Sequence, residues 1–461
     1  MVLKSGKRIG FNKITLRTFF AITLPLAAQN LITVLVNLVD NIMVGRLGDT
    51  AIATVNSANQ FFFIYTLFVF GAVSGSGVLM AQFWGKKDMG GIRRTTGLCV
   101  WATLTAGLIL GVFLFAFPET IMRIFSKDAS VIEGGARYIK ITAATYPLTA
   151  LSLSVSATVK NVERVRLPLI SSTAAIIINV LFNYLLIFGK FGFPALGVSG
   201  AAYATLLARA AECVLIIFLA VTQVDFITKN IKDYFDIPKD FIKKYFKISF
   251  PVMFNETLWS IGISLYVAVY ARTGLTPEDG TAAVAAANIS NIMERLCNVF
   301  AFGMAYAVSI IIGKEIGSGR VKRAVYDASQ FSVISFLSGI IFGAVMAFAA
   351  PFYLRLFALS DAAYIYARNI IFMLSFSLAF RNFTLIAIVG IMRGGGDTLY
   401  ACILDLGGVW LLGVPCVFIA GILLKLPLEF VFASSLIEEI VKFFLSIRRV
   451  KSRKWIHDLV N

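Results

Sequence analysis

The sequence is poor in the residues that most catalytic and metal chemistry uses. It holds one histidine, His457, which excludes histidine metal sites and Ser-His-Asp triads. Its five cysteines form no CxxC pair and lie scattered in apolar stretches, as small buried residues do: Cys99, Cys213, Cys297, Cys402 and Cys416. No ATP-binding motif is present. The sequence therefore predicts no enzyme and no cofactor, and energy for any transport must come from an ion gradient.

Charge is also scarce. Only 15% of the 461 residues are charged, 58% are hydrophobic, and the mean hydropathy is +0.83. A transmembrane helix needs about 20 apolar residues, and the chain has twelve such segments. The first is too long for a cleaved signal peptide. The segments are 16–45, 51–83, 95–117, 134–159, 168–188, 196–222, 246–272, 281–312, 324–350, 362–392, 399–421 and 427–447.

The net charge of +17 reflects membrane orientation. Lysines and arginines gather in both tails and in alternate loops, whereas the other loops hold only Arg46, Arg123, Lys127, Lys190, Arg272, Arg355 and Lys425. Cytoplasmic loops carry this excess of basic residues. We therefore expect both termini in the cytoplasm, and we expect a lipid bilayer, not a nucleic acid, as the partner of this basic chain.

The chain repeats itself once. FFAITLPLAAQN (19–30) matches YFKISFPVMFNE (245–256) at an offset of 226, and WGKKDMGGIRR (84–94) recurs as IGKEIGSGRVKR (312–323). Each repeat holds six segments, so both insert the same way round, as a parallel repeat. The sequence predicts an N-terminal lobe at 1–222, a cytoplasmic linker at 223–245, and a C-terminal lobe with a basic tail at 246–461.

We thus expect an all-α integral membrane protein with twelve transmembrane helices, arranged as two six-helix lobes around a central cleft. This is a transporter architecture, and we expect a monomeric, multi-pass protein of the inner cell membrane. Four stretches make the chain similar to the multidrug and toxic compound extrusion (MATE) family: LPLAAQNLITVLVNLVDNIMVGRLG (24–48), INVLFNYLLIFG (178–189), GVSGAAYAT (197–205) and IMRGGGDT (391–398). The resemblance implies export of organic, often cationic compounds in exchange for Na⁺ or H⁺.

Asp40 is the only formal charge in the run from Thr18 to Gly45. Helical rise places it roughly 8 Å below the outer surface, at the depth of Asn183, with Asn179 one turn deeper. Thr205 opens the next helix at a similar depth. These oxygens suit a hard cation such as Na⁺, with Asp40 as its charged ligand, and burial without a cation favours the protonated acid.

The resemblance places Asp40, Asn179, Asn183 and Thr205 on the family's N-lobe cation site. Some members have an aspartate at the position of Asn183, so this chain has one negative charge there. Asp40 has no obvious cationic neighbour, because Arg46 lies at the outer interface. The alternative is that Asp40 only bonds neighbouring helices.

The C-terminal lobe has a possible second site. Glu256 lies near the membrane midplane, where the resemblance implies a partner acid on the tenth helix. That position is Asn382, and Arg381 precedes it. Two interpretations stay open: a stabilising Glu256–Arg381 ion pair, or a role in transport. We expect local charge pairing in Glu294–Arg295, Arg209–Glu212 and Glu438–Glu439–Lys442.

The preferred function is a secondary antiporter that exports amphipathic organic compounds by alternating access. Aromatic residues are candidates for lining its cleft and contacting a cation through their rings, with ordinary packing as the alternative: Phe61, Phe62, Tyr146, Tyr266 and Tyr270. A lipid-linked saccharide flippase is the alternative function, with Arg295 or Arg381 holding a diphosphate. A channel or receptor fits the repeat poorly.

Overall fold

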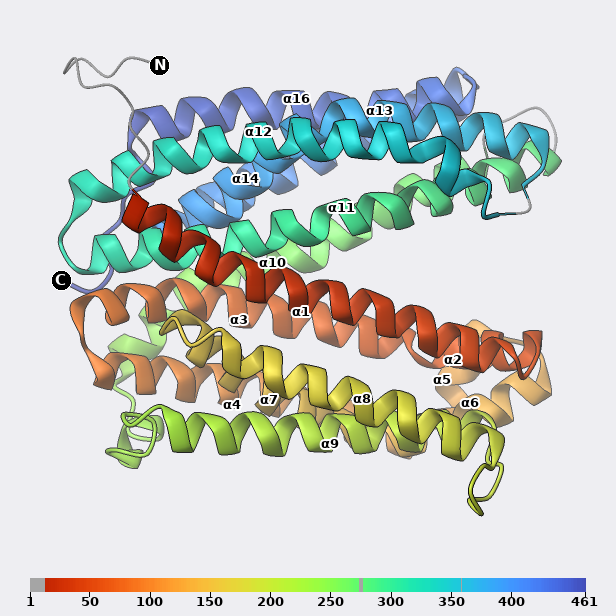
Figure 1. Ribbon diagram of the computed structural model, residues 1–461, viewed down its shortest axis with the longest axis horizontal. Helices are drawn as coiled ribbons and strands as arrows, with labels where there is room; N and C mark the ends of the chain where they lie inside the picture. The colour runs from red at the N-terminus through yellow and green to blue at the C-terminus, as the bar shows by residue number, and fades with distance from the viewer. Residues whose placement is uncertain (1–12, 273–276, 358) are drawn as a thin grey trace. The chain divides into compact units, whose positions relative to one another are not determined.

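A computed structural model describes residues 13–272, 277–357 and 359–461, and the regular structure of these residues is helical (Figure 1). Helices are expected, because in lipid a helix satisfies its own backbone hydrogen bonds. The first part of the chain forms α1 (Lys13–Gly45), α2 (Asp49–Ala58), α3 (Gln60–Lys86), α4 (Met89–Ala116), α5 (Pro118–Phe125), α6 (Ala129–Thr142), α7 (Thr145–Asn161), α8 (Arg166–Phe188) and α9 (Val198–Gln223).

The second part contains irregular helical segments as well as long helices. A 3₁₀ turn, η1, precedes α10, and three π-helical segments, η2 to η4, interrupt the helices near the C-terminus. The elements are η1 (Ile231–Tyr234), α10 (Lys239–Tyr270), α11 (Pro277–Gly317), α12 (Val321–Leu354), α13 (Asp361–Leu385), η2 (Ile386–Arg393), α14 (Thr398–Gly407), η3 (Gly408–Gly413), α15 (Val414–Phe418), η4 (Ile419–Leu423) and α16 (Leu428–Ser452).

The chain divides into two compact units. We call residues 28–253 the N-terminal unit, and residues 1–27 with 254–461 the C-terminal unit. The divisions fall within α1 and α10, shortly after Pro25 and Pro251, the two prolines that the sequence repeat aligns. The predicted lobes follow chain order, whereas these units group residues that lie together in space. Residues 13–27 of α1 therefore belong to the C-terminal unit, and residues 239–253 of α10 belong to the N-terminal unit.

Ten helices in the described part of the chain are long and apolar enough to cross a membrane, and they agree closely with ten of the predicted segments. The other two segments coincide with shorter or more polar helices. Segment 134–159 lies on α6 and α7, which are separate helices of 14 and 17 residues. Segment 427–447 lies on α16, where Glu438, Glu439 and Lys442 raise the charge above that of an ordinary span.

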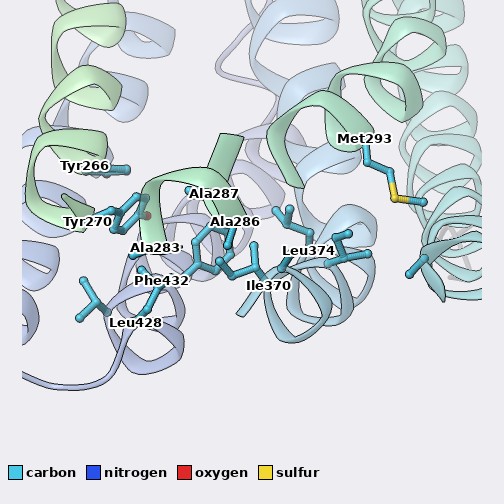
Figure 2. Packing of buried hydrophobic residues seen from close by; sticks show 14 of the residues in the cluster. Tyr266, Tyr270, Ala283, Ala286, Ala287, Met293, Ile370, Leu374, Leu428 and Phe432 are labelled. Carbon is cyan, nitrogen blue, oxygen red and sulfur yellow. The ribbon is translucent and has the colours of Figure 1, made fainter. Parts of the chain in front are cut away.

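Each unit has its own hydrophobic core. In the N-terminal unit, Tyr65 and Tyr146 are buried among side chains such as Val69, and the Tyr65 hydroxyl donates to the Tyr146 carbonyl at 3.1 Å. In the C-terminal unit, Figure 2 shows Tyr266 and Tyr270 beside the buried alanines of α11 and apolar residues of α16. These cores fix the helices that carry the polar residues discussed below.

A tight turn holds α8 and α9 side by side. Gly189 ends α8 with a φ of 64°, and the Leu196 amide then donates to the Leu186 carbonyl at 2.8 Å. A Cβ atom at Gly200 would lie 2.5 Å from the same carbonyl oxygen, so only glycine permits this approach. The turn thereby holds α8, which carries Asn179 and Asn183, against α9, which carries Thr205.

Candidate functional site

Three of the predicted N-terminal site residues meet in the structure. Asn183 Nδ2 on α8 donates to Asp40 Oδ1 on α1 at 2.5 Å. Both polar atoms of the Asn179 amide find hydrogen-bond partners when its nitrogen faces Asp40. The nitrogen then lies 2.7 Å from Oδ1 and 3.2 Å from Oδ2 of Asp40. Both amides are buried. The structure thus brings Asp40, Asn179 and Asn183 together, and their role in cation coupling stays a prediction.

Asn183 also presents an acceptor toward this buried region. Its Oδ1 atom has no hydrogen-bond partner among the residues that the structure describes, although Asn183 is only 2% exposed. A buried acceptor without a donor costs free energy. The described residues contain no group of three acidic, histidine or cysteine side chains placed around a metal. The donor set of one carboxylate with neutral oxygens therefore matches a singly charged cation better than a divalent one.

Thr205 reaches the site less directly. Its hydroxyl donates to the carbonyl of Ala201 in its own helix at 2.9 Å. The hydroxyl of buried Tyr138 on α6 faces both Thr205 and Asn59, and Tyr138 lies within electrostatic range of Asp40. Tyr138 and Asn59 were not predicted from the sequence. Their positions along the chain alone do not show that they approach the Asp40 site.

Asp40 has a cationic neighbour, Arg209, contrary to the expectation from the sequence. The positive charge of Arg209 on α9 acts on the Asp40 carboxylate. The same guanidinium is paired with Glu212 at 2.8 Å and lies 5.8 Å from the centre of the Phe62 ring. The predicted Arg209–Glu212 pair is thus confirmed.

The predicted Glu256–Arg381 pair is wrong. Glu256 on α10 instead accepts from Arg393 Nη1 at 2.7 Å. Arg381 on α13 bonds Glu294 on the adjacent α11, and its Nε lies 4.0 Å from Glu439. Arg393 ends the π-helical segment η2, and the sequence gives no sign of that winding. The packing of the helices therefore decides this pairing, and the depth of each residue along its helix does not predict it.

The other predicted features of the C-terminal unit have mixed outcomes. Lys442 lies 3.7 Å from Glu438 and 3.2 Å from Glu439, which confirms that local group. The predicted Glu294–Arg295 pair is wrong, because Glu294 bonds Arg381 across helices. Asn382 is 1% exposed, and neither of its amide atoms has a hydrogen-bond partner within the described residues.

The five predicted cleft aromatics lie mainly in packed surroundings. Tyr146, Tyr266 and Tyr270 are between 3% and 6% exposed and belong to the cores of their units. Phe62 packs edge-on against Tyr146 with ring centres 5.5 Å apart, and Phe61 packs against Phe125 at 5.9 Å. These contacts account for the residues as core side chains, and a role in substrate binding stays a prediction.

Known proteins match the chain along most of its length. The family model described as MatE matches residues 25–185 and 249–419, one stretch in each sequence repeat. The "Probable multidrug resistance protein YoeA" of Bacillus subtilis (strain 168) is 25% identical over 418 residues, 89% of this chain and 88% of the relative. The "Probable multidrug resistance protein NorM" of Thermotoga maritima is 24% identical over 442 residues, 94% of this chain and 92% of the relative.

Solved structures show the same fold at low sequence identity. An "Outward-facing conformation of a multidrug resistance MATE family transporter of the MOP superfamily" has a TM-score of 0.84 at 18% identity and covers 97% of this chain and 100% of that chain. The "Crystal structure of MATE in the straight conformation" has a TM-score of 0.84 at 19% identity, covering 95% and 96%. The chain therefore belongs to the MATE family of multidrug efflux transporters, as its motifs predict, and it is a multi-pass protein of the cell membrane.

Proposed function

We propose that the protein is a monomeric antiporter that exports amphipathic, cationic organic compounds in exchange for Na⁺ or H⁺ by alternating access. The observation that carries the proposal is the contact of Asp40 with Asn179 and Asn183. An ionisable group buried in a membrane helix is costly, and such groups mark ion pathways. Here the two side chains that contact the acid are amides, which change neither charge nor protonation.

The amides support both forms of this site. Without a cation, the nitrogens of Asn179 and Asn183 face the Asp40 carboxylate and satisfy it. An asparagine that turns about its terminal torsion exchanges donor for acceptor, because its oxygen and nitrogen are nearly isosteric. Two turned amides would offer oxygens to Na⁺ beside Asp40. When Asp40 is protonated, the hydrogen bonds of the site are satisfied with only one amide turned. We therefore propose both Na⁺ and H⁺ as candidate coupling ions.

We propose twelve membrane spans, with both termini in the cytoplasm. Ten of these spans are the long apolar helices. The α6–α7 pair forms one further span, and α16 forms the other. The asymmetric distribution of basic residues supports the orientation. A protease site or tag inserted at 225–243 should react only from the cytoplasmic side. Reaction only from outside contradicts the orientation and leaves the helix assignments intact.

The names of the relatives support organic compounds as substrates, since two of the matched proteins are described as multidrug resistance proteins. The lipid-linked saccharide flippase is not favoured. Of the arginines suggested for holding its diphosphate, Arg381 is already engaged by Glu294 and lies near Glu439, while Arg295 is exposed. Neither is a free cation inside a unit.

Transport in reconstituted vesicles tests the proposal. Purified protein is inserted into vesicles that hold a fluorescent lipophilic cation, and a Na⁺ gradient or a pH gradient is imposed separately. One of the two gradients should drive dye movement well above that of protein-free vesicles. Vesicles without a gradient control for passive leakage. Movement that neither gradient changes contradicts antiport, and binding only of phosphorylated polyprenols favours the flippase.

A further inference from the structure

The chain between α9 and α10 is folded closely against the N-terminal unit. We call residues 224–238 the linker segment, and it contains the 3₁₀ turn η1 (Ile231–Tyr234), which packs on α4. In this turn, Asp233 Oδ2 accepts a hydrogen bond from Arg93 Nε of α4 at 2.8 Å. Arg93 Nη1 also donates to the carbonyl of Phe226 at 3.2 Å, and Arg93 is only 5% exposed. An ion pair with a buried arginine therefore fixes the linker segment on α4.

The surface of α4 is shaped for this contact. A Cβ atom at Gly97 would lie 2.5 Å from the carbonyl oxygen of Tyr234, so glycine permits the close approach. That carbonyl also accepts from Trp101 Nε1 at 3.3 Å, and the Tyr234 hydroxyl donates to the Ile227 carbonyl at 3.0 Å. Residues 95–99 of α4 are buried, whereas Trp101 is exposed. The linker segment thus helps to bury the beginning of α4, as far as Trp101.

The other side of the linker segment is apolar and open. Ile231 is 61% exposed and Phe235 is 66% exposed. The Phe235 ring lies against that of Trp101, which is 46% exposed, with the ring centres 5.7 Å apart. We call Trp101, Ile231 and Phe235 the apolar patch. Large apolar side chains that gather on a connecting segment mark a contact with an apolar medium or partner.

The apolar patch continues the lipid-facing surface of α4. This helix is one of the ten that are long and apolar enough to cross a membrane. Beyond Trp101, one line of exposed residues recurs every three or four positions, at Thr105, Leu108 and Val112, and none of them is charged. An uncharged exposed stripe on a membrane span faces acyl chains, and tryptophan is enriched where these chains meet the headgroups. Trp101 therefore places the apolar patch at that boundary.

The exposed charges beside the apolar patch are balanced. Lys229 and Lys232 are exposed on the linker segment, and so are Asp225 and Asp236. Two positive and two negative charges give no net attraction for anionic headgroups. Long lysine side chains keep their ammonium groups in water while apolar neighbours enter lipid. A contact of this segment with the bilayer must therefore rest on the burial of apolar surface.

We propose that the linker segment is an interfacial anchor, in which Ile231 and Phe235 insert beside Trp101 into the boundary between acyl chains and headgroups. The partner is the bilayer surface itself, because the apolar patch is continuous with the lipid-facing side of α4. The ion pair of Arg93 with Asp233 positions the anchor, since it holds η1 on the helix that carries Trp101. The linker segment thus belongs to the N-terminal unit and to the membrane surface, and is not a free tether between the repeats.

Spin labels measure the depth of these side chains in the full-length protein. Ile231→Cys and Phe235→Cys are labelled and placed in vesicles of a neutral phosphatidylcholine, with Asp236→Cys as the matched exposed control. The unsubstituted protein, treated with the same label, gives the background from its native cysteines. Labels at Ile231 and Phe235 should collide more often with oxygen, which concentrates in lipid, than with a water-soluble nickel complex. The label at Asp236 should show the reverse.

Three results overturn the proposal. Labels at Ile231 and Phe235 that are as accessible to the nickel complex as the label at Asp236 show that no insertion takes place. Protection that appears only in vesicles with anionic lipid shows a contact based on charge instead of apolar burial. Spin–spin coupling between labels on different molecules assigns the apolar patch to a contact between copies. None of these measurements needs an ion gradient or a substrate, so their outcome is independent of antiport.

Substitutions in the ion pair test its positioning role. Asp233→Asn and Arg93→Gln each weaken the pair, so the label at Phe235 should become as accessible to the nickel complex as the label at Asp236. Arg93→Lys keeps the charge and should preserve part of the protection. Lys232→Gln, an exposed change in the same turn, should leave the protection unchanged.

The two variants of the pair also control for misfolding. Arg93 is buried in α4, whereas the Asp233 side chain is 21% exposed in the turn, so Asp233→Asn should leave the fold of α4 intact. Thermal unfolding of Asp233→Asn close to that of the unsubstituted protein, with loss of protection at Phe235, supports the positioning role. Unchanged protection in both Asp233→Asn and Arg93→Gln contradicts it.

Discussion

The two units bury acidic groups in opposite ways. The N-terminal unit places one carboxyl, Asp40, against the neutral amides of Asn179 and Asn183. The C-terminal unit places four carboxyls around two cations. A lone acid among amides can gain or lose a cation while its neighbours adjust. An acid within a network is coupled to several charges at once, so changing it also changes the stability of the unit.

The largest expected effect follows from this comparison. Asp40→Asn removes the charge with almost no change of volume, so the fold should survive. Gradient-driven export should fall to the level of empty vesicles, because an amide neither binds a proton nor attracts Na⁺ as a carboxylate does. Substrate binding should remain, because none of the candidate cleft aromatics is a residue of the cation site. Export in reconstituted vesicles and binding of a fluorescent cation measure the two properties separately.

Asp49→Asn is the matched control for this experiment. Asp49 belongs to the same unit and follows α1 closely, but it is exposed in the first turn of α2. It should leave export unchanged. Full export in Asp40→Asn, with loss in Glu256→Gln, would assign coupling to the C-terminal unit and contradict the proposed role of Asp40.

The next largest effect concerns stability. Lys442→Gln leaves Glu438, Glu439 and Asp405 without their shared ammonium group, and removal of one partner from a buried ionic group costs about 3–5 kcal/mol. We expect early thermal unfolding in detergent and lower yield of folded protein. Lys451→Gln, an exposed change near the end of the same helix, is the control. Equal unfolding temperatures for both variants would show that Lys442 does not hold these carboxylates together.

A smaller effect is expected at the neighbouring ion pair. Glu256→Gln removes the carboxylate that bonds Arg393, whose side chain is 3% exposed. It should lower the unfolding temperature while leaving much of the gradient-driven export, in contrast to Asp40→Asn. The double variant Glu256→Gln/Arg393→Met replaces the buried pair with uncharged groups and should recover part of the lost stability. A loss of export without a loss of stability would indicate a direct transport role for Glu256.

The sequence predicted the helices and the N-terminal contacts better than the charge pairs. Apolar runs give the positions of the ten long spans, because their length is set by the bilayer. Asn179 and Asn183 were found because their i, i+4 spacing fixes them on one face. Asp40 could be matched to them by depth alone, since each helix crosses the same membrane.

Pairing across helices needed information that the sequence does not carry. Arg381 and Glu256 were joined by approximate depth, yet each has a nearer partner, Glu294 and Arg393 respectively. Rotation of a helix about its axis decides such pairs, and the π-helical segment η2 changes that rotation just before Arg393. Tyr138 was missed for the same reason, because the rotation of α6 about its axis decides which residues the Tyr138 hydroxyl faces.

The smallest predicted effect tests whether the carboxylate contacts of Lys442 require the shape of η3. Gly408→Ala adds a Cβ atom 2.7 Å from Lys442 Cδ, and Lys442 is held by carboxylates on both sides, so it has little freedom to move away. Overpacking of this kind costs about 1–3 kcal/mol. Gly407→Ala is a close control, since its nearest neighbour would be Leu411 Cδ1 at 4.0 Å. Thermal unfolding should separate the two variants, and only Gly408→Ala should lower the unfolding temperature. Equal behaviour of both variants would mean that Lys442 adjusts freely, and that the glycine is not needed to admit it.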